Sequence, residues 1–366
     1  MEAGTAVASV ARWRQGIRQR ARAMLAEFVR DRCAEHVRGV PGAELVAGLL
    51  GEYVAGGKYL RSTFAYIGWL CGGAGDSDAA LRAAASMELL HAFALLQDDV
   101  MDASPMRRGR ATAHVRIADW HRARGQAGDA GRFGESAAIL LGDLCLVWAE
   151  QMLRESGLSA AALGRAWPYY DALRGELAVG QFADLFYDAR RRPAMADVLD
   201  MTRRKSGNYT VRRPLELGAA LAGCDQVVLR ALAGYGELVG EAFQLRDDLL
   251  GVFGSPAVTG KPDGGDLRER KATSVVVLAG ELATPSQRER LDRLCARDRL
   301  TEAEIAAWRG LIEETGAVTQ IERMIENRAT TAWAGLENAA VEGAPLDAFV
   351  LTVLRDLAIR ATDRVW

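Results

Sequence analysis

The sequence predicts an all-α protein, because apolar residues recur at helical spacing along most of its 366 residues. Leu140, Leu144 and Val147, for example, lie three and four residues apart and share one helical face. Alternating patterns typical of strands are scarce, and the best strand candidate, Ser274 to Leu278, is too isolated to build a sheet. The predicted helices span residues 5–35, 60–72, 79–102, 133–156, 160–188, 208–222, 226–251, 286–298, 302–314, 317–338 and 346–364.

The composition is that of an ordinary globular protein, and it excludes several classes. Hydrophobic residues make up 49% of the chain, enough for a large core. The 46 basic and 48 acidic residues give a net charge of −2, so we expect no nucleic-acid partner. Five widely spaced cysteines without a CxxC pair disfavour structural zinc and a disulfide scaffold, and they favour a reducing compartment.

The chain is predicted to form one domain, residues 1–366, without a transmembrane segment. Breaks rich in glycine and proline do not separate regions of different composition; they fall at 72–76, 125–134 and 254–265. The most apolar stretch, Ala137 to Leu153, carries two acidic residues, whereas a spanning helix needs roughly 18 uncharged ones. The N-terminal helix, about residues 1–40, is a candidate peripheral element and lacks the apolar core of a secretory signal. We therefore expect a cytoplasmic protein.

The segment from His91 to Asp102 carries the strongest functional signal. Asp98 and Asp102 are one helical turn apart, Asp99 flanks them, and the residues before them are almost purely apolar. Like charges in this arrangement repel each other and call for a counter-ion, and carboxylate oxygens suit Mg²⁺. His91, two turns before Asp98, is either a ligand contact or a histidine at the edge of the core.

A second acidic pair, Asp247 and Asp248, follows another apolar helical stretch. Two such helices facing each other would make a cavity with a rim of carboxylates and an apolar wall below it. The alternative is that one or both pairs simply end helices at the protein surface.

Lysine is rare among the 46 basic residues, and each lysine lies near a glycine or a predicted helix end. The lysines are Lys58, Lys205, Lys261 and Lys271. A compact ammonium group suits the oxygens of a diphosphate, where a guanidinium would impose a planar geometry. Arg107 and Arg108, close after the first acidic segment, add capacity for binding an anion. The alternative is that these lysines are chance survivors in an arginine-rich chain.

Five segments, read together, resemble the motifs of the trans-isoprenyl diphosphate synthases, or polyprenyl synthetase family, over about residues 50 to 280. Gly56–Arg61 resembles the GGKxxR element, and Asp98–Asp102 with Arg107–Gly109 resembles the first Asp-rich motif, DDxxD with its trailing RRG. The GQxxD element, the K[TS] element and the second Asp-rich motif are matched by Gly180–Asp184, Lys205–Ser206 and Phe243–Asp248. Two positions depart from the pattern: Ser62 stands where proline is usual, and Gly251 replaces the last Asp of the second motif, which puts an outer contact to the metal in doubt.

The resemblance implies an isoprenoid-synthase fold, with one polyprenyl synthetase domain of long helices around a central apolar cavity, usually in a homodimer. It also implies a reaction, the condensation of isopentenyl diphosphate with an allylic diphosphate (dimethylallyl, geranyl or farnesyl) with three Mg²⁺ ions. The implied metal ligands are Asp98, Asp99, Asp102, Asp247 and Asp248; Asp98, Asp102 and Asp247, with Lys205, are the implied catalytic group. The implied substrate-binding residues are Lys58, Arg61, His91, Arg107, Arg108, Lys205, Ser206, Gln244, Lys261 and Lys271.

The length of the product is also predicted from the resemblance. In this family, bulky groups four and five positions before the first Asp-rich motif close the apolar cavity. Ala94 leaves the cavity open one turn before Asp98, and Phe93 narrows it without closing it. We therefore expect geranylgeranyl diphosphate (C20) as the main product, with farnesyl diphosphate (C15) as the alternative.

Two further functions are compatible with the fold, a class I terpene cyclase and a non-catalytic synthase subunit. Asp247, Gly251 and Ser255 occupy the spacing of the second metal site of a cyclase but do not match its residue types. A non-catalytic subunit usually loses one Asp-rich motif, and this chain keeps both largely intact. The sequence therefore favours the synthase.

Overall fold

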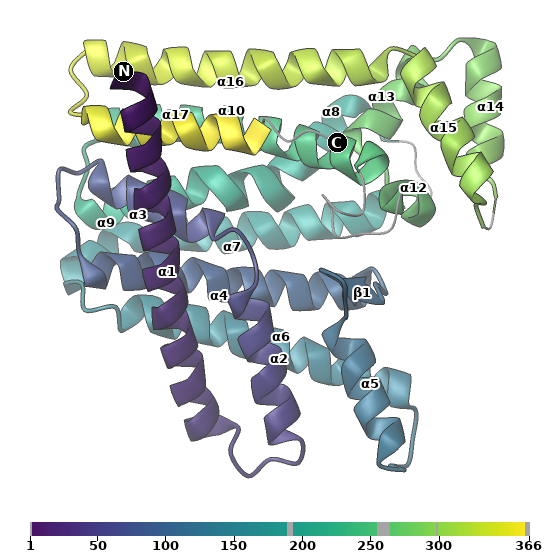
Figure 1. The fold of residues 1–366 in the computed structure, drawn as a ribbon, viewed down its shortest axis with the longest axis horizontal. Coiled ribbons are helices and arrows are strands. Elements are labelled where there is room, and N and C mark those ends of the chain that lie inside the picture. The colour runs from purple at the N-terminus through teal and green to yellow at the C-terminus, as the bar shows by residue number, and fades with distance from the viewer. Residues whose placement is uncertain (1, 189–192, 255–263, 298, 363–366) are drawn as a thin grey trace. The chain divides into compact units, whose positions relative to one another are not determined.

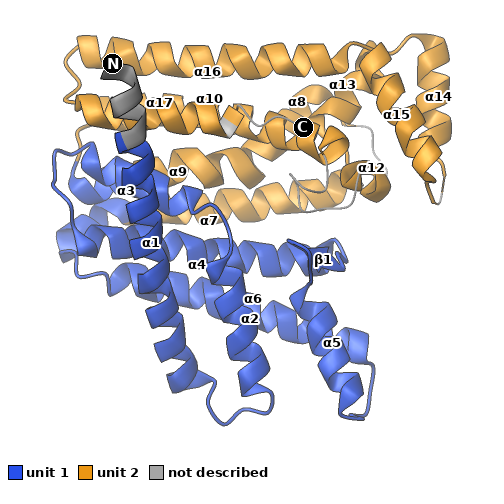
Figure 2. Ribbon diagram, viewed as in Figure 1, with its two compact units in different colours: residues 1–166, 218–223 blue, residues 167–217, 224–366 orange. Residues whose placement is uncertain are grey.

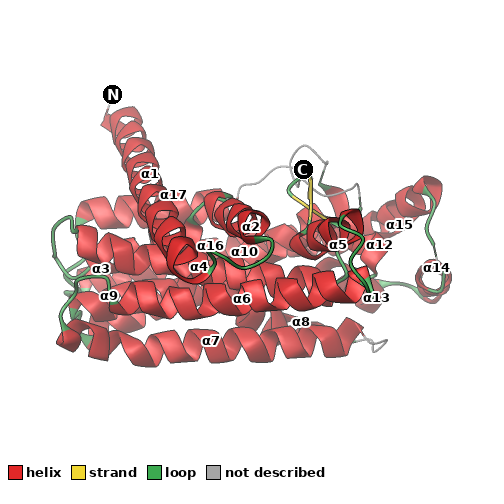
Figure 3. Ribbon diagram, turned by 90° about the horizontal axis from the view of Figure 1, so that it is seen from below, coloured by secondary structure: helices red, strands yellow, loops and turns green. Residues whose placement is uncertain are grey.

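The computed structural model describes residues 2–188, 193–254, 264–297 and 299–362, and its elements are almost all helices (Figures 1 and 3). The exception within these ranges is a short antiparallel hairpin of β1 (Met106–Arg107) and β2 (Arg110–Ala111). The all-α prediction is confirmed.

By compactness the chain divides into two units (Figure 2). Unit 1 comprises residues 1–166 and 218–223, and unit 2 comprises residues 167–217 and 224–366. The expectation of a single domain stays a prediction.

Unit 1 contains the N-terminal helices. They are α1 (Glu2–His36), α2 (Ala43–Ala55), α3 (Leu60–Leu70), α4 (Asp78–Met101), α5 (Ala113–Ala123), α6 (Ala130–Arg154) and the first residues of α7 (Ala160–Asp188). In α1, Ala21 and Leu25 have no exposed surface, and the helix contacts α2, α3 and α4. The N-terminal helix is therefore packed into unit 1.

The helix α4 is central to unit 1 and lies alongside α6 (Figure 1). Its start is determined by Ser77, whose side-chain oxygen accepts a hydrogen bond from the backbone N–H of Ala80 at 3.3 Å. Leu89 and Leu90 have no exposed surface, so the middle of the helix lies in the core. This packing makes α4 a rigid support for the acidic residues at its C-terminal end.

Among the residues that the structure describes, two helices, α4 and α6, are long and apolar enough to cross a membrane by length and composition. Their apolar windows are 67% and 44% buried against the rest of the protein. The burial of α4 is typical of a core helix, that of α6 is less complete, and the absence of a membrane span stays a prediction.

Unit 2 contains the later helices. They are the rest of α7, α8 (Met195–Thr202), the π-helix η1 (Arg203–Arg212), the start of α9 (Arg213–Ala222), α10 (Gln226–Phe253), α12 (Gly265–Glu269), α13 (Ser274–Leu282), α14 (Pro285–Cys295), α15 (Glu302–Glu314), α16 (Ala317–Val341) and α17 (Ala348–Thr362). The helix α10 packs against η1 and α16. Its first turn is capped by Asp225, which accepts hydrogen bonds from the N–H groups of Val227 and Val228, both at 2.9 Å.

The strand candidate Ser274 to Leu278 was wrong, because these residues begin α13. Val275, Leu278 and Ala279 are three and four residues apart and are buried in the core of unit 2, so tertiary packing outweighs the strand propensity of the valines. No helix was predicted at α2, α5, α8 or α12, which lie between the predicted helices.

The packing of unit 1 makes a prediction about Gly218 in α9. A Cβ atom added there would overlap the backbone oxygen of Ala65 in α3, so Gly218→Ala must push the two helices apart. We expect this change to cost about 1–3 kcal/mol of stability and to lower the Tm in thermal unfolding followed by circular dichroism. Gly234→Ala in α10 is the matched control, because nothing lies within 4 Å of its Cβ position. The control should be neutral or stabilising; equal Tm values for both variants would contradict this account of the packing.

Candidate active site

The first acidic cluster lies at the C-terminal end of α4 and is held by an arginine and a tyrosine. Arg107 donates from Nε to Asp99 Oδ1 at 2.6 Å and from Nη2 to Asp98 Oδ2 at 3.1 Å. The Tyr53 hydroxyl donates to Asp99 Oδ2 at 2.7 Å. The side chain of Asp99 is only 1% exposed, whereas that of Asp98 is 24% exposed, and Asp102 caps the helix half-buried. Both oxygens of Asp99 are therefore engaged within the protein, and Asp98 and Asp102 are the more accessible carboxylates.

Burial is the main influence on the titration of Asp99. It raises the pKa of the carboxyl group, while the charge of Arg107 and the hydrogen bonds from Tyr53 and Arg107 act in the opposite direction. Burial and the neighbouring Asp99 likewise raise the pKa of Tyr53, so the phenol stays a proton donor. The three residues form one partly buried network.

The hairpin after α4 brings Arg107 back to the acidic residues. Arg107 pairs with Arg110 across a two-residue turn, Arg108–Gly109, whose φ values of 52° and 75° belong to a type I′ turn. Glycine suits the second of these positions because it adopts a positive φ at little cost. The local sequence thus explains how Arg107 reaches the end of α4.

Arg108 lies against the glycine pair that ends α2. A Cβ atom at Gly56 would overlap Arg108 Nη1, and one at Gly57 would lie 3.2 Å from Arg108 Nη2. Gly57 also has a φ of 114°, which disfavours other residues. The glycine pair therefore makes room for the guanidinium of Arg108.

His91 lies within reach of several guanidinium groups. Burial, followed by the charges of Arg61, Arg108 and Arg107, holds the pKa of His91 well below its usual range, so the imidazole is neutral. The structure thus brings together four of the expected substrate-binding residues: Arg61, His91, Arg107 and Arg108. Lys58, which is also expected to bind substrate, is exposed in the loop before α3.

The second acidic pair lies near the end of α10, in unit 2. Asp248 is 4% exposed and accepts hydrogen bonds from Ser274 N at 2.9 Å, Ser274 Oγ at 2.6 Å and Gln244 Nε2 at 2.8 Å. Burial raises the pKa of Asp248 to about 6 against these hydrogen bonds. Asp247 is exposed. Asp247 is thus the accessible carboxylate of the pair, and Gln244, expected to bind substrate, donates to Asp248.

The glycine in place of the last Asp of the second motif has a steric reason. A Cβ atom at Gly251 would overlap the carboxylate of Asp266, which is 7% exposed in α12. Asp266 also lies close enough to Asp248 for its charge to raise the pKa of that residue. A carboxylate therefore occupies the space next to Gly251, although it comes from a different helix.

The remaining predicted residues of unit 2 lie in three places. Lys205 in η1 forms an ion pair with Asp184 of α7, and Ser206 follows it half-buried. A Cβ atom at Gly180 would overlap the backbone N of Lys205, so a glycine lets α7 and η1 approach closely. Lys271 Nζ lies 3.4 Å from Glu269 Oε2. Lys261 lies outside the described residues.

The sequence analysis missed four residues that contact or neighbour the predicted site residues: Tyr53, Ser274 and Asp266, and Glu88 of α4, which accepts hydrogen bonds from Ser62 next to Arg61. Glu88 carried a signal, because it is an acid in an apolar helical segment three residues before His91. Tyr53 carried none, since its partner Asp99 is 46 residues away in the chain.

A divalent cation would find oxygen ligands at both acidic pairs, which is the donor type that Mg²⁺ prefers. Within the described residues, no group of three or more His, Cys, Asp and Glu side chains could hold a metal ion by itself. The accessible Asp98 and Asp102 fit an ion that completes its coordination with water and substrate oxygens, as Mg²⁺ usually does.

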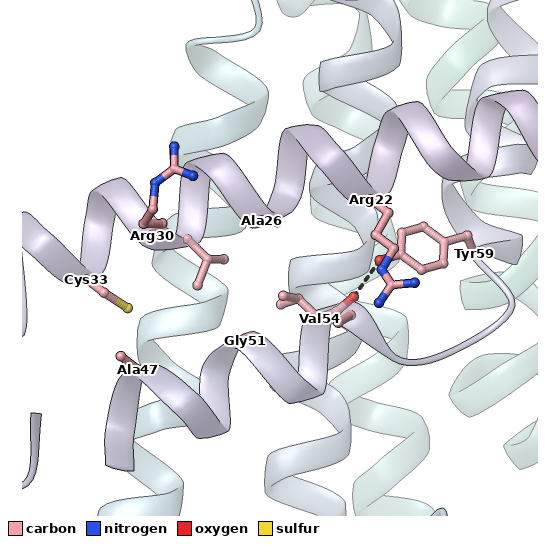
Figure 4. A pocket seen from close by; sticks show the side chains of 10 residues that line it. Arg22, Ala26, Arg30, Cys33, Ala47, Gly51, Val54 and Tyr59 are labelled. Carbon is pink, nitrogen blue, oxygen red and sulfur yellow. Dashed lines mark hydrogen bonds between the residues drawn. The ribbon is translucent and has the colours of Figure 1, made fainter. Parts of the chain in front are cut away.

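A cavity of about 310 Å³ lies in unit 1 between α1 and α2 (Figure 4). It is lined by Arg22, Ala26, Val29, Arg30, Cys33, Ala47, Gly51, Val54, Ala55 and Tyr59. None of the predicted site residues lines it, and Tyr59, which directly follows Lys58, is the lining residue nearest to them in the chain.

Comparison with known proteins gives consistent matches. The polyprenyl synthetase family model matches residues 43–312. Over 285 residues the chain is 33% identical to a geranylgeranyl diphosphate synthase of Mycobacterium tuberculosis, covering 77% of this chain and 75% of that protein. Over 288 residues it is 32% identical to a (2E,6E)-farnesyl diphosphate synthase of Mycobacterium bovis, covering 77% and 70%. A geranylgeranyl pyrophosphate synthase from Corynebacterium glutamicum, solved with isoprenyl diphosphate and magnesium, has a TM-score of 0.88 at 36% identity, covering 95% and 99% of the two chains.

The family match begins at the first residue of α2 and spans well over half of the chain. The likeness to the solved synthase confirms that the helices form the isoprenoid-synthase fold. The relatives match along most of their own length and are diphosphate synthases. The chain therefore belongs to the polyprenyl synthetase family, as a short-chain trans-prenyltransferase.

Proposed function

We propose that the protein condenses isopentenyl diphosphate with dimethylallyl, geranyl and farnesyl diphosphates to give geranylgeranyl diphosphate, as a cytoplasmic homodimer. The observation that carries this proposal is the arrangement along α4. Accessible carboxylates, Asp98 and Asp102, end the helix. Two turns earlier, the neutral His91 lies near the guanidinium groups of Arg61 and Arg108. A carboxylate site and a cation site so close together suit two different diphosphates.

The two sites would divide the substrates between them. Asp98, Asp102 and Asp247 would hold three Mg²⁺ ions, with Asp99 and Asp248 beside them, and the ions would supply positive charge to the leaving diphosphate. Arg61, Arg108 and Lys58, with neutral His91, would bind isopentenyl diphosphate so that its double bond faces the allylic carbon.

Further residues would bind the allylic diphosphate at its oxygens. They are Arg107, Lys205, Ser206, Gln244, Lys261 and Lys271. In the structure Lys205 is paired with Asp184 and Arg107 with Asp98 and Asp99, so binding would draw these cations from carboxylates to the substrate.

The reaction balances without a protein base. The C–O bond of the allylic diphosphate breaks, and its carbon forms a new C–C bond with isopentenyl diphosphate. The released pyrophosphate accepts the proton that the isopentenyl carbon loses. An apolar cavity would protect the allylic cation from water.

The C20 product is supported by the exposure of side chains along α4. His91 and Ala94, on the face that leads from Asp98, are half-buried. Leu90 and Met87 are 0% and 1% exposed. This pattern supports a cavity floor about two turns below Asp98. The similar mycobacterial and corynebacterial geranylgeranyl synthases support the same length, while the farnesyl synthase supports the C15 alternative.

The direct experiment incubates the purified protein with Mg²⁺, isopentenyl diphosphate and each allylic primer, and identifies the products by mass. Geranylgeranyl diphosphate from every primer supports the proposal. Products that stop at C15 would correct the length, a cyclic hydrocarbon would indicate the cyclase, and the absence of turnover with all primers would indicate the non-catalytic subunit.

We predict that Asp102→Ala lowers kcat by at least about 10²–10³-fold, because it removes a carboxylate from the ions that stabilise the leaving group. The Tm should not fall, since one of several repelling acids is lost. Asp119→Ala, an exposed acid on α5, is the control and should leave kcat unchanged. A near-wild-type kcat of Asp102→Ala at saturating Mg²⁺ would refute the assigned site.

We predict that Ala94→Phe shortens the product to C15 or less. The new ring would close the cavity one turn, about 5.4 Å, below Asp98. The measurement is the chain-length distribution by mass with farnesyl diphosphate and with dimethylallyl diphosphate as primer. An unchanged distribution would show that Ala94 does not line the path of the growing chain.

A further inference from the structure

We propose that Glu88 is a positioning residue for the isopentenyl diphosphate site: its buried carboxylate anchors the helix that carries Arg61 and balances the charge of Arg108 until a diphosphate takes over that role. The inference rests on the proposed function, which places isopentenyl diphosphate among these cations. All the residues concerned belong to unit 1.

The start of α3 is capped by a residue of another helix, α4. The α3 helix begins after Tyr59, which has a φ of 57° and makes no side-chain cap. Glu88 Oε1 in α4 accepts hydrogen bonds from Ser62 N at 3.0 Å and Ser62 Oγ at 2.8 Å. Glu88 thus satisfies one of the N–H groups that a helix start leaves without a partner, and its negative charge suits the positive end of the helix dipole.

The position of this cap connects it to the binding site. Ser62 is fully buried and directly follows Arg61 in the first turn of α3. Glu88 is 4% exposed and lies one turn before His91 on the same face of α4. The hydrogen bonds between Glu88 and Ser62 therefore fix the position of Arg61 in α3 relative to His91 in α4.

Glu88 also acts on the charge of Arg108. This residue is exposed as a whole, but its guanidinium lies against Gly56 and Gly57. Burial lowers the pKa of Arg108 most, and the charges of Arg107 and Arg61 lower it as well. The charge of Glu88 raises it. Glu88 is therefore a counter-charge in a group of cations that repel one another.

A diphosphate bound among these cations would also balance their positive charge, and it carries more negative charge than the carboxylate of Glu88. Removal of the Glu88 charge should leave Arg108 in the free protein with less compensating negative charge, and this costs stability. The same removal should increase the stabilisation that a bound diphosphate provides, because the ligand then relieves a larger repulsion. A residue that only packed the core would lower the Tm without changing the response to the ligand.

The test compares Glu88→Gln with the wild type in thermal unfolding, with EDTA and with or without saturating isopentenyl diphosphate. Gln keeps the size of the side chain and the oxygen that accepts from Ser62, but it removes the charge. We expect a lower Tm for the free variant and a larger gain in Tm from the ligand than in the wild type. Ser62→Ala is the matched control, because it removes one hydrogen bond but keeps the charge of Glu88. Isopentenyl diphosphate should therefore raise the Tm of Ser62→Ala by as much as it raises that of the wild type.

A double-mutant cycle covers the case in which Glu88→Gln is too unstable to measure. Glu88→Gln combined with Arg108→Gln should be more stable than Glu88→Gln alone, since the cation that Glu88 balances is also gone. The inference is overturned if the double variant is no more stable than Glu88→Gln. It is also overturned if isopentenyl diphosphate raises the Tm of Glu88→Gln by no more than it raises that of the wild type. A wild-type protein that gains no stability from isopentenyl diphosphate would instead count against the proposed function.

Discussion

Arg107 is the cation on which the arrangement of the first acidic cluster depends. Asp98 and Asp99 are adjacent carboxylates that repel each other, and one guanidinium bonded to both makes their positions compatible. Arg107 reaches them because the hairpin turns back after α4, and the same turn directs Arg108 to the glycines at the end of α2. One local turn thus organises both the carboxylates proposed for the metal ions and the cations proposed for the second diphosphate.

The two acidic pairs follow the same design. In each pair one carboxylate is buried and saturated with protein donors: Asp99 by Tyr53 and Arg107, and Asp248 by Ser274 and Gln244. The neighbouring Asp98 and Asp247 are more accessible. The buried member gives the backbone a defined position, so the accessible member is held ready for a ligand without a large loss of conformational freedom on binding.

The helical architecture could be predicted from periodicity because long amphipathic and buried helices repeat the same spacing many times. The prediction of a strand at Ser274 to Leu278 was wrong because a short apolar run fits either a strand or a helix. Only its packing against the core of unit 2 decides which of the two forms. The acids, lysines and arginines of the site could be found from motif spacing, but their partners could not. Glu88 and Ser62 are 26 residues apart, and the replacement of an Asp by Gly251 is understood only when Asp266 is seen beside it.

We infer that the protein offers only part of the coordination of its metal ions and that a diphosphate completes it. Isothermal titration of inorganic pyrophosphate into the protein, with and without Mg²⁺, and of Mg²⁺ alone, tests this claim most directly. We predict weak binding of Mg²⁺ alone and at least about tenfold tighter binding of pyrophosphate when Mg²⁺ is present. Tight binding of Mg²⁺ without pyrophosphate, or a pyrophosphate affinity independent of Mg²⁺, would contradict the account.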